Sequence, residues 1–299
     1  MEQLGLEGMP TKLLVCSPSS LASYTDCPRR YRFAYVDRPA PPKGGPWAHN
    51  TIGAAAHSAL HQWWQVPLPR RTPAAAGTLL RAAWTDDGFR DPEQSARWRE
   101  RARAWVEDYA ATLDPAVEPR GVERQVATKT PTMALSGRID RLDDRDGQLV
   151  VVDYKTGRWV PDESDTRSSL ALAVYAVAAG RMFHRPCHRV ELHHLPSGTV
   201  AAAEHTDESL DRHLRRAGDT AADISAARAA VESGGDPDRA FPANPGPHCG
   251  LCDFRRVCPV GQAAAPAREP WSTLVEPEVA PSGEPGPDAA VDTVVELDG

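Results

Sequence analysis

The sequence predicts an α/β protein with a small mixed sheet flanked by helices, and three features indicate this class. Apolar and polar residues alternate on both sides of the Asp-Arg-Asp-Gly turn at 144–147, as in a hairpin of two strands. A second hairpin pattern, 189–195 and 199–204, surrounds Pro-Ser-Gly at 196–198. Segments with apolar residues three or four positions apart lie before and after these hairpins, which is typical of packed helices.

The chain is expected to begin its ordered part with a helix. Ser17 suits the N-cap and Pro18 the first helical position, and the helix runs into 26–33. There Arg29, Arg30 and Arg32 alternate with aromatic residues, a composition that suits contact with a nucleic-acid backbone. A solvated face with its aromatics packed inward is the more common explanation of such a run taken alone.

Three further helices are expected before the sheet, at 51–64, 72–86 and 93–113. The first carries His57 and His61 four residues apart, and therefore on one face. A single helical histidine is more often a partly buried structural residue than a ligand. His57 therefore matters only if other site residues lie beside it.

The first hairpin carries the residues that favour chemistry. Asp153 and Lys155 are two residues apart on the second strand, so both side chains project from one face, and the hairpin can bring Asp140 beside Asp153. Two adjacent carboxylates repel each other, and a divalent cation relieves that repulsion. A lysine beside such a cation can hold a water and stabilise developing negative charge, as phosphodiester hydrolysis requires. A preceding strand at 122–126 offers Glu123 as a further carboxylate.

A structural explanation of the same charges is a solvated strand, where ion pairs contribute little. The run Val150-Val151-Val152 argues against it, because β-branched runs are typical of buried strands. After the hairpin, a helix at 168–182 presents Tyr175, which either reaches the site or packs. A long polar helix at 207–232 completes the expected elements.

Six cysteines are present, and three of them lie close together as Cys249, Cys252 and Cys258. Thiolates at this spacing predict a metal site, either zinc or an iron–sulfur cluster. The fourth ligand is then His248 for zinc, or Cys27, which also precedes a proline. Three buried structural thiols are the alternative.

The net charge of −7 comes from one segment. Residues 262–299 contain one basic and eight acidic residues, so the rest of the chain is neutral and a nucleic-acid partner is not excluded. The sequence predicts an extension at 1–14, one domain at 15–260 and a disordered acidic Pro/Ala-rich tail at 261–299. With no membrane-length apolar run and no secretory signal, a cytoplasmic location with no membrane partner is expected.

These motifs together resemble the RecB-type branch of the PD-(D/E)XK nucleases, specifically its iron–sulfur members, such as the AddB nuclease domain and the CRISPR adaptation exonucleases. The resemblance covers about 15–260 and rests on five matches in family order. They are 17–31 with Cys27, 53–57 with His57, 137–140 with Asp140, 153–157 with its lysine, and Cys249, Cys252 and Cys258. It implies a restriction-endonuclease-like core with an N-terminal helical insertion and a C-terminal cysteine-rich clasp.

The resemblance also implies roles. His57, Asp140, Asp153 and the Tyr154 carbonyl would bind Mg²⁺ or Mn²⁺, Lys155 would position the attacking water, and Glu123 and Tyr175 would complete the catalytic set. Cys27, Cys249, Cys252 and Cys258 would hold a [4Fe–4S] cluster that joins the two ends of the domain. One position departs from the family: Ala171 stands where a glutamine is frequent four residues before the tyrosine, which affects efficiency or substrate preference.

The resulting hypothesis is a metal-dependent deoxyribonuclease that cuts single strands from DNA ends during repair or recombination. No Gly-x4-Gly-Lys-Ser/Thr phosphate loop is present, so any helicase would be a separate protein. Three alternatives stay open: a CRISPR adaptation nuclease, a non-catalytic DNA-binding iron–sulfur module, and a zinc-stabilised interaction protein.

Overall fold

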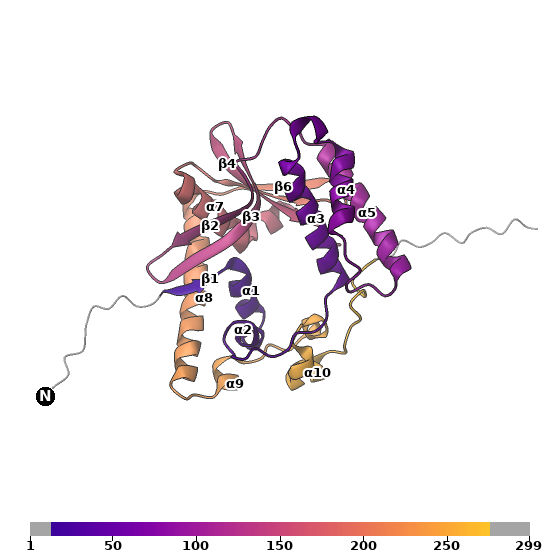
Figure 1. The fold of residues 1–299 in the computed structure, drawn as a ribbon. Coiled ribbons are helices and arrows are strands. Elements are labelled where there is room, and N and C mark those ends of the chain that lie inside the picture. Colours follow the sequence, from indigo (N-terminus) through magenta and orange to yellow (C-terminus); the bar gives the residue numbers. More distant parts are fainter. Residues whose placement is uncertain (1–12, 276–299) are drawn as a thin grey trace, which may run out of the picture.

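A computed structural model describes residues 13–275, in which a six-stranded mixed sheet lies between two groups of helices (Figure 1). Helices α3, α4 and α5 lie on one side of the sheet, whereas α7 and α8 lie on the other. The predicted α/β class with a restriction-endonuclease-like core is confirmed. None of the helices in this described range is long and apolar enough to span a bilayer.

The elements follow one another with short connections. The strands are β1 (Leu14–Cys16), β2 (Gly121–Lys129), β3 (Met133–Arg145), β4 (Gln148–Lys155), β5 (Arg189–His194) and β6 (Thr199–Glu204). The α-helices are α1 (Pro18–Asp26), α2 (Pro28–Tyr35), α3 (Ala48–Gln65), α4 (Pro73–Ala83), α5 (Pro92–Ala111), α6 (Glu163–Ser168), α7 (Leu170–Phe183), α8 (Asp207–Glu232), α9 (Pro237–Ala240) and α10 (Pro259–Ala264). Three short 3₁₀ turns are η1 (Leu68–Arg70), η2 (Pro247–Leu251) and η3 (Arg255–Val257).

Strand β3 organises the sheet, because it pairs on both edges with different partners. Antiparallel β2 pairs along one edge, from Ala134 to Leu142. The other edge pairs with parallel β1 at 133–135 and with antiparallel β4 only from Arg141 onward. Within residues 13–275, the segment 136–140 therefore has no strand partner on that edge, and Asp140 lies at the point where β3 and β4 separate.

Strand β4 is buried on both faces, as its valine run predicts. Val150, Val152 and Tyr154 pack against α3, α4 and α5. Leu149 and Val151 pack against α7 on the opposite face. Because side chains alternate along a strand, Asp153 and Lys155 project from the α7 face of the sheet. A third core joins α1, α8 and β1 around Leu21, Met133 and Phe241.

Two predicted boundaries differ from the structure. The segment before the helix expected at 168–182 is not a plain loop, because it contains α6, which Asp162 caps by accepting from the Asp165 N–H at 2.8 Å. The predicted tail is ordered at its beginning, since 259–264 form α10 and the Ala48 N–H donates to the Pro270 carbonyl at 3.2 Å. A disordered segment cannot start at 261. The rest of the predicted tail, 276–299, and the extension at 1–12 lie outside the described residues.

Candidate active site

Three elements bring an imidazole and two carboxylates together. His57 comes from α3, Glu123 from β2 and Asp140 from β3, and one ligand atom of each lies within 4.8 Å of the others. His57 Nδ1 is 3.3 Å from Asp140 Oδ1 and 4.0 Å from Glu123 Oε1. The predicted convergence of His57 with the acidic hairpin is therefore present. Helix α3 comes this close because Gly53 leaves room for Thr156, whose Oγ1 would lie 3.3 Å from an added Cβ.

The backbone of Glu123 is strained. Its φ of 49° lies in the left-handed region, which is uncommon for a residue other than glycine, asparagine or aspartate. The pairs on either side, Val122 with Arg141 and Arg124 with Ile139, keep the antiparallel register, so Glu123 interrupts the ladder opposite Asp140. Such strain is typical of functional sites, where surrounding contacts hold it in place.

The predicted residues of β4 lie beside this group. The Tyr154 N–H donates to Asp140 Oδ2 at 2.8 Å, and the Tyr154 carbonyl oxygen lies 3.2 Å from His57 Nε2. Lys155 Nζ pairs with Asp153 Oδ2 at 2.5 Å. The carbonyl of Tyr154 thus points toward His57, and its role as a metal ligand stays a prediction. Asp153 faces Lys155 and is not a member of the His57–Glu123–Asp140 group.

The charges of these residues perturb one another. Burial disfavours the imidazolium of His57, but the hydrogen bond and charge of Asp140, with Asp153 and Glu123, outweigh it and raise the pKa of His57. Burial and the charge of Asp140 raise the pKa of Asp153, although Lys155 opposes that shift. The carboxylates therefore favour positive charge at the position of His57.

Tyr175 reaches the site rather than packing away from it. It lines an open cavity of about 670 Å³ together with His57, Glu123, Gly137 and Asp140. A Cβ atom at residue 137 would overlap the Tyr175 ring, so a glycine is required there for α7 to approach β3. Burial, followed by Asp153 and Asp140, raises the pKa of Tyr175, which keeps its hydroxyl protonated.

The donor set fits a hard divalent cation. Imidazole nitrogen and carboxylate oxygens are ligands of Mg²⁺ and Mn²⁺ sites, and metal binding displaces the protons that such ligands carry. The raised pKa of His57 marks the place where positive charge is favoured. His57, Glu123 and Asp140 would hold the ion, with the Tyr154 carbonyl beside them.

The four predicted cluster cysteines lie around one cavity. Cys27 at the start of α2 and Cys249, Cys252 and Cys258 near the C-terminal end line a cavity of about 220 Å³, and all four are free thiols. Backbone N–H groups of Asn244 and Gly261 lie 3.4 and 3.3 Å from the sulfurs of Cys27 and Cys258.

The spacing of these thiols is wider than a zinc site needs. Four sulfurs on one zinc ion would be about 3.8 Å apart, given Zn–S bonds of about 2.3 Å. Within residues 13–275, the His57–Glu123–Asp140 group is the one set of three or more such ligands within 4.8 Å of one another. The alternative zinc ligand, His248, has its Nε2 at 2.9 Å from the Asn244 carbonyl oxygen.

The predicted DNA contacts of the α2 arginines need correction. Arg29 and Arg32 are only 12% and 10% exposed, and both pair with Asp238 of α9, at 3.1 and 2.7 Å. Their charges are therefore used within the protein rather than offered to a phosphate backbone. Arg30 is 41% exposed and lines the cysteine cavity. Burial raises the pKa of Cys252 there, and the charge of Arg30 partly opposes this shift.

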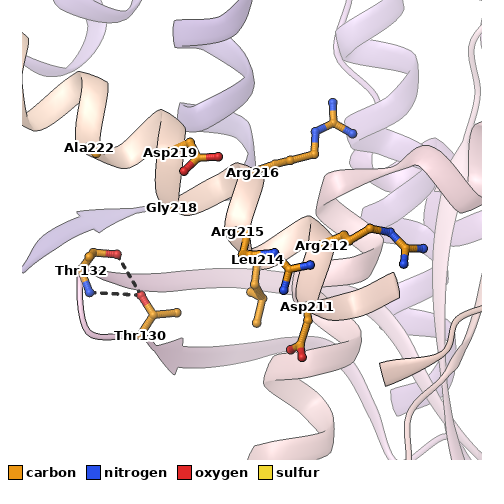
Figure 2. Close-up of a pocket in the computed structure, with 10 residues that line it drawn as sticks. All are labelled: Thr130, Thr132, Asp211, Arg212, Leu214, Arg215, Arg216, Gly218, Asp219 and Ala222. Atoms are coloured by element: carbon orange, nitrogen blue, oxygen red, sulfur yellow. Dashed lines mark hydrogen bonds between the residues drawn. The ribbon is translucent and has the colours of Figure 1, made fainter. Parts of the chain in front are cut away.

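A second open cavity, of about 680 Å³, lies between α8 and the turn that joins β2 to β3 (Figure 2). Arg212, Arg215 and Arg216 line it, but Figure 2 shows the side chains of Arg212 and Arg216 extending away from Thr130 rather than converging. Asp211 and Asp219 alternate with them. This is the pattern of a solvated helix face.

The comparisons with known proteins show the superfamily of the chain. Residues 15–259 match the family model of the PD-(D/E)XK nuclease superfamily, so the chain belongs to that superfamily. Together with the His57–Glu123–Asp140 group, this membership supports a metal-dependent nuclease. The superfamily prediction is confirmed, whereas the RecB-type branch and the iron–sulfur cluster stay predictions.

Two solved structures are similar in outline. One is the crystal structure of SSO0001, at 13% identity, a TM-score of 0.39, and coverage of 84% of this chain and 88% of that one. The other, from Eubacterium rectale and described as a "Putative exonuclease", has 11% identity, a TM-score of 0.48, and coverage of 86% and 94%. At these scores neither similarity bears on substrate or mechanism. No curated protein sequence matches the chain.

Sequence reasoning missed Arg138 as part of the site. Its Nε lies 2.8 Å from Glu123 Oε2, and its side chain is 64% exposed at the rim of the cavity. Arg138 lies two positions before Asp140 in the 137–140 motif. Because side chains alternate along a strand, this spacing indicates that both side chains lie on the same face.

Proposed function

We propose that the protein is a Mg²⁺- or Mn²⁺-dependent deoxyribonuclease of the RecB-type branch that degrades single-stranded DNA from an end, in repair or recombination. The observation that supports it best is the group of His57, Glu123 and Asp140 beside the Asp153–Lys155 pair. A separate helicase partner stays a prediction.

The residues of the site have distinct roles in this proposal. A divalent ion held by His57, Glu123 and Asp140 would polarise the scissile phosphate and neutralise its charge. Asp153 pairs with the Lys155 ammonium at the C-terminal end of β4. From there the lysine would orient an attacking water and stabilise negative charge on the phosphate. The protonated hydroxyl of Tyr175 would donate a hydrogen bond to the same phosphate.

We include a [4Fe–4S] cluster in the proposal. Four free thiols around one cavity, a spacing wider than a zinc tetrahedron, and N–H groups directed at two sulfurs support it. Burial raises the pKa of Cys252, and the positive charge of Arg30 reduces the cost of a thiolate there.

Lys155→Ala tests the activity. The Lys155 side chain is 47% exposed, so its removal should leave the fold intact while the Mg²⁺-dependent degradation of end-labelled single-stranded DNA falls at least about a hundredfold. Lys129→Ala, an exposed lysine at the end of β2, is the matched control and should retain activity. Degradation by Lys155→Ala at the wild-type rate would exclude this mechanism.

A further inference from the structure

Trp159 is the most exposed large apolar residue of the described chain, and it lies four residues after Lys155, the last residue of β4. Its exposed fraction is 76%, and the next residue, Val160, is 45% exposed. An indole left in water at a fixed position needs a reason, because burial of such a ring is favourable.

The position of Trp159 relates it to the active site. Trp159 lies four positions after Lys155, so their Cα atoms are at most about 14 Å apart. The connecting segment starts beside the site cavity, since a Cβ added to Gly53, which lines that cavity, would lie 3.3 Å from Thr156 Oγ1. The Gly157 carbonyl is held by His194 Nε2 at 2.7 Å.

The ring is held in one orientation despite its exposure. Trp159 Nε1 donates to Asp165 Oδ2 at 3.0 Å, and the same oxygen accepts from the Asp162 N–H at 3.0 Å. Helix α6, which carries Asp165, is joined to β6 by the hydrogen bond from Thr166 Oγ1 to the Ala201 carbonyl at 3.3 Å. The indole is therefore an oriented surface attached to the sheet.

We propose that Trp159 stacks on an unpaired base of the substrate strand beside the scissile phosphate, and thereby favours single-stranded over duplex DNA. Aromatic rings that bind single strands do so by stacking, which tolerates any base sequence. A base inside a duplex is already stacked, so the ring gains such a contact only where the strand is unpaired. This inference rests on the proposed nuclease function.

The test compares Trp159→Ala with Trp159→Phe on end-labelled single strands and on the blunt duplex of the same sequence. Trp159→Ala should lose roughly 5- to 150-fold in kcat/KM on single strands, from the usual effect of one stacking contact, and much less on the duplex. Trp159→Phe should stay within a few-fold of wild type. The control is Val117→Ala, at another exposed apolar residue (65%), which should leave kcat/KM unchanged on both substrates.

A single abasic position moved along the strand tests the contact itself. An abasic site at the position that Trp159 contacts should slow cleavage by the wild type about as much as the Trp159→Ala substitution does. The same abasic site should not slow Trp159→Ala any further. Equal abasic profiles for the two proteins would overturn the inference.

Binding without catalysis separates this inference from the proposed function. Fluorescence anisotropy of the same single strand in EDTA should show weaker binding by Trp159→Ala whether or not DNA is cut. A wild type that binds but never cuts contradicts the nuclease function alone. Equal affinities of wild type and Trp159→Ala contradict the stacking role.

Discussion

Glu123 shows how one residue can lower stability and still serve the site. Its left-handed backbone costs about 1 kcal/mol or more for a residue with a side chain, and its carboxylate lies near that of Asp140. Glu123→Gly should therefore keep or raise the free energy of unfolding without metal, by up to about 1 kcal/mol. The same change should weaken Mn²⁺ binding at least about tenfold, because one charged ligand is lost. Thermal unfolding and calorimetric titration with Mn²⁺ measure the two effects.

Asp146 supplies the control for that experiment. It has a φ of 51° in the turn between β3 and β4, away from the metal group. Asp146→Gly should change stability in the same direction and leave Mn²⁺ affinity as it is. An unchanged affinity in Glu123→Gly would show that Glu123 is not a ligand.

The sequence allowed most of the site residues to be predicted, because their chemistry is local. Asp153 and Lys155 share a strand face by simple alternation, and Asp140 is brought near them by a short hairpin. Arg29 and Arg32 were misassigned for the opposite reason. The partner that they share, Asp238, lies about 200 residues further along the chain, and no local pattern connects it with α2.

At the scale of elements, the contact between α7 and β3 sets the shape of the site. Gly137→Ala would push the Tyr175 ring out of its place, because the added Cβ overlaps that ring. We expect a loss of about 1–3 kcal/mol in unfolding free energy, as for other overpacked contacts, with a nuclease rate at least about tenfold lower. Chemical denaturation and the single-strand digestion assay provide the measurements.

Gly45→Ala is the matched control, since a Cβ there meets no atom within 4 Å. It should retain both stability and activity. Full activity of Gly137→Ala would mean that Tyr175 can move without consequence for the site.

The arrangement of the strands could be predicted only in part. The two hairpins were recognised, since their turns lie within a few residues of both strands. The parallel pairing of β1 with β3 was not, because β1 has three residues and its partner lies more than a hundred positions away. Yet this pairing matters, as β1 and β4 share one edge of β3 and leave Asp140 in the gap between them.

At the scale of the whole molecule, the cysteine cavity joins segments from the two ends of the domain. Cys27 and Cys249 are about 220 residues apart, and a cross-link closing a loop of that size contributes about 5 kcal/mol in the chain-entropy account. Cys27→Ser should therefore lose iron and lower the Tm by roughly 10–20 °C.

The control is Cys16→Ser, at a buried free cysteine outside the cavity, which should retain iron and its visible absorbance. Iron content after anaerobic purification and thermal unfolding test this expectation. One zinc per chain in the wild type, or full iron together with an unchanged Tm in Cys27→Ser, would contradict a cluster that Cys27 helps to hold.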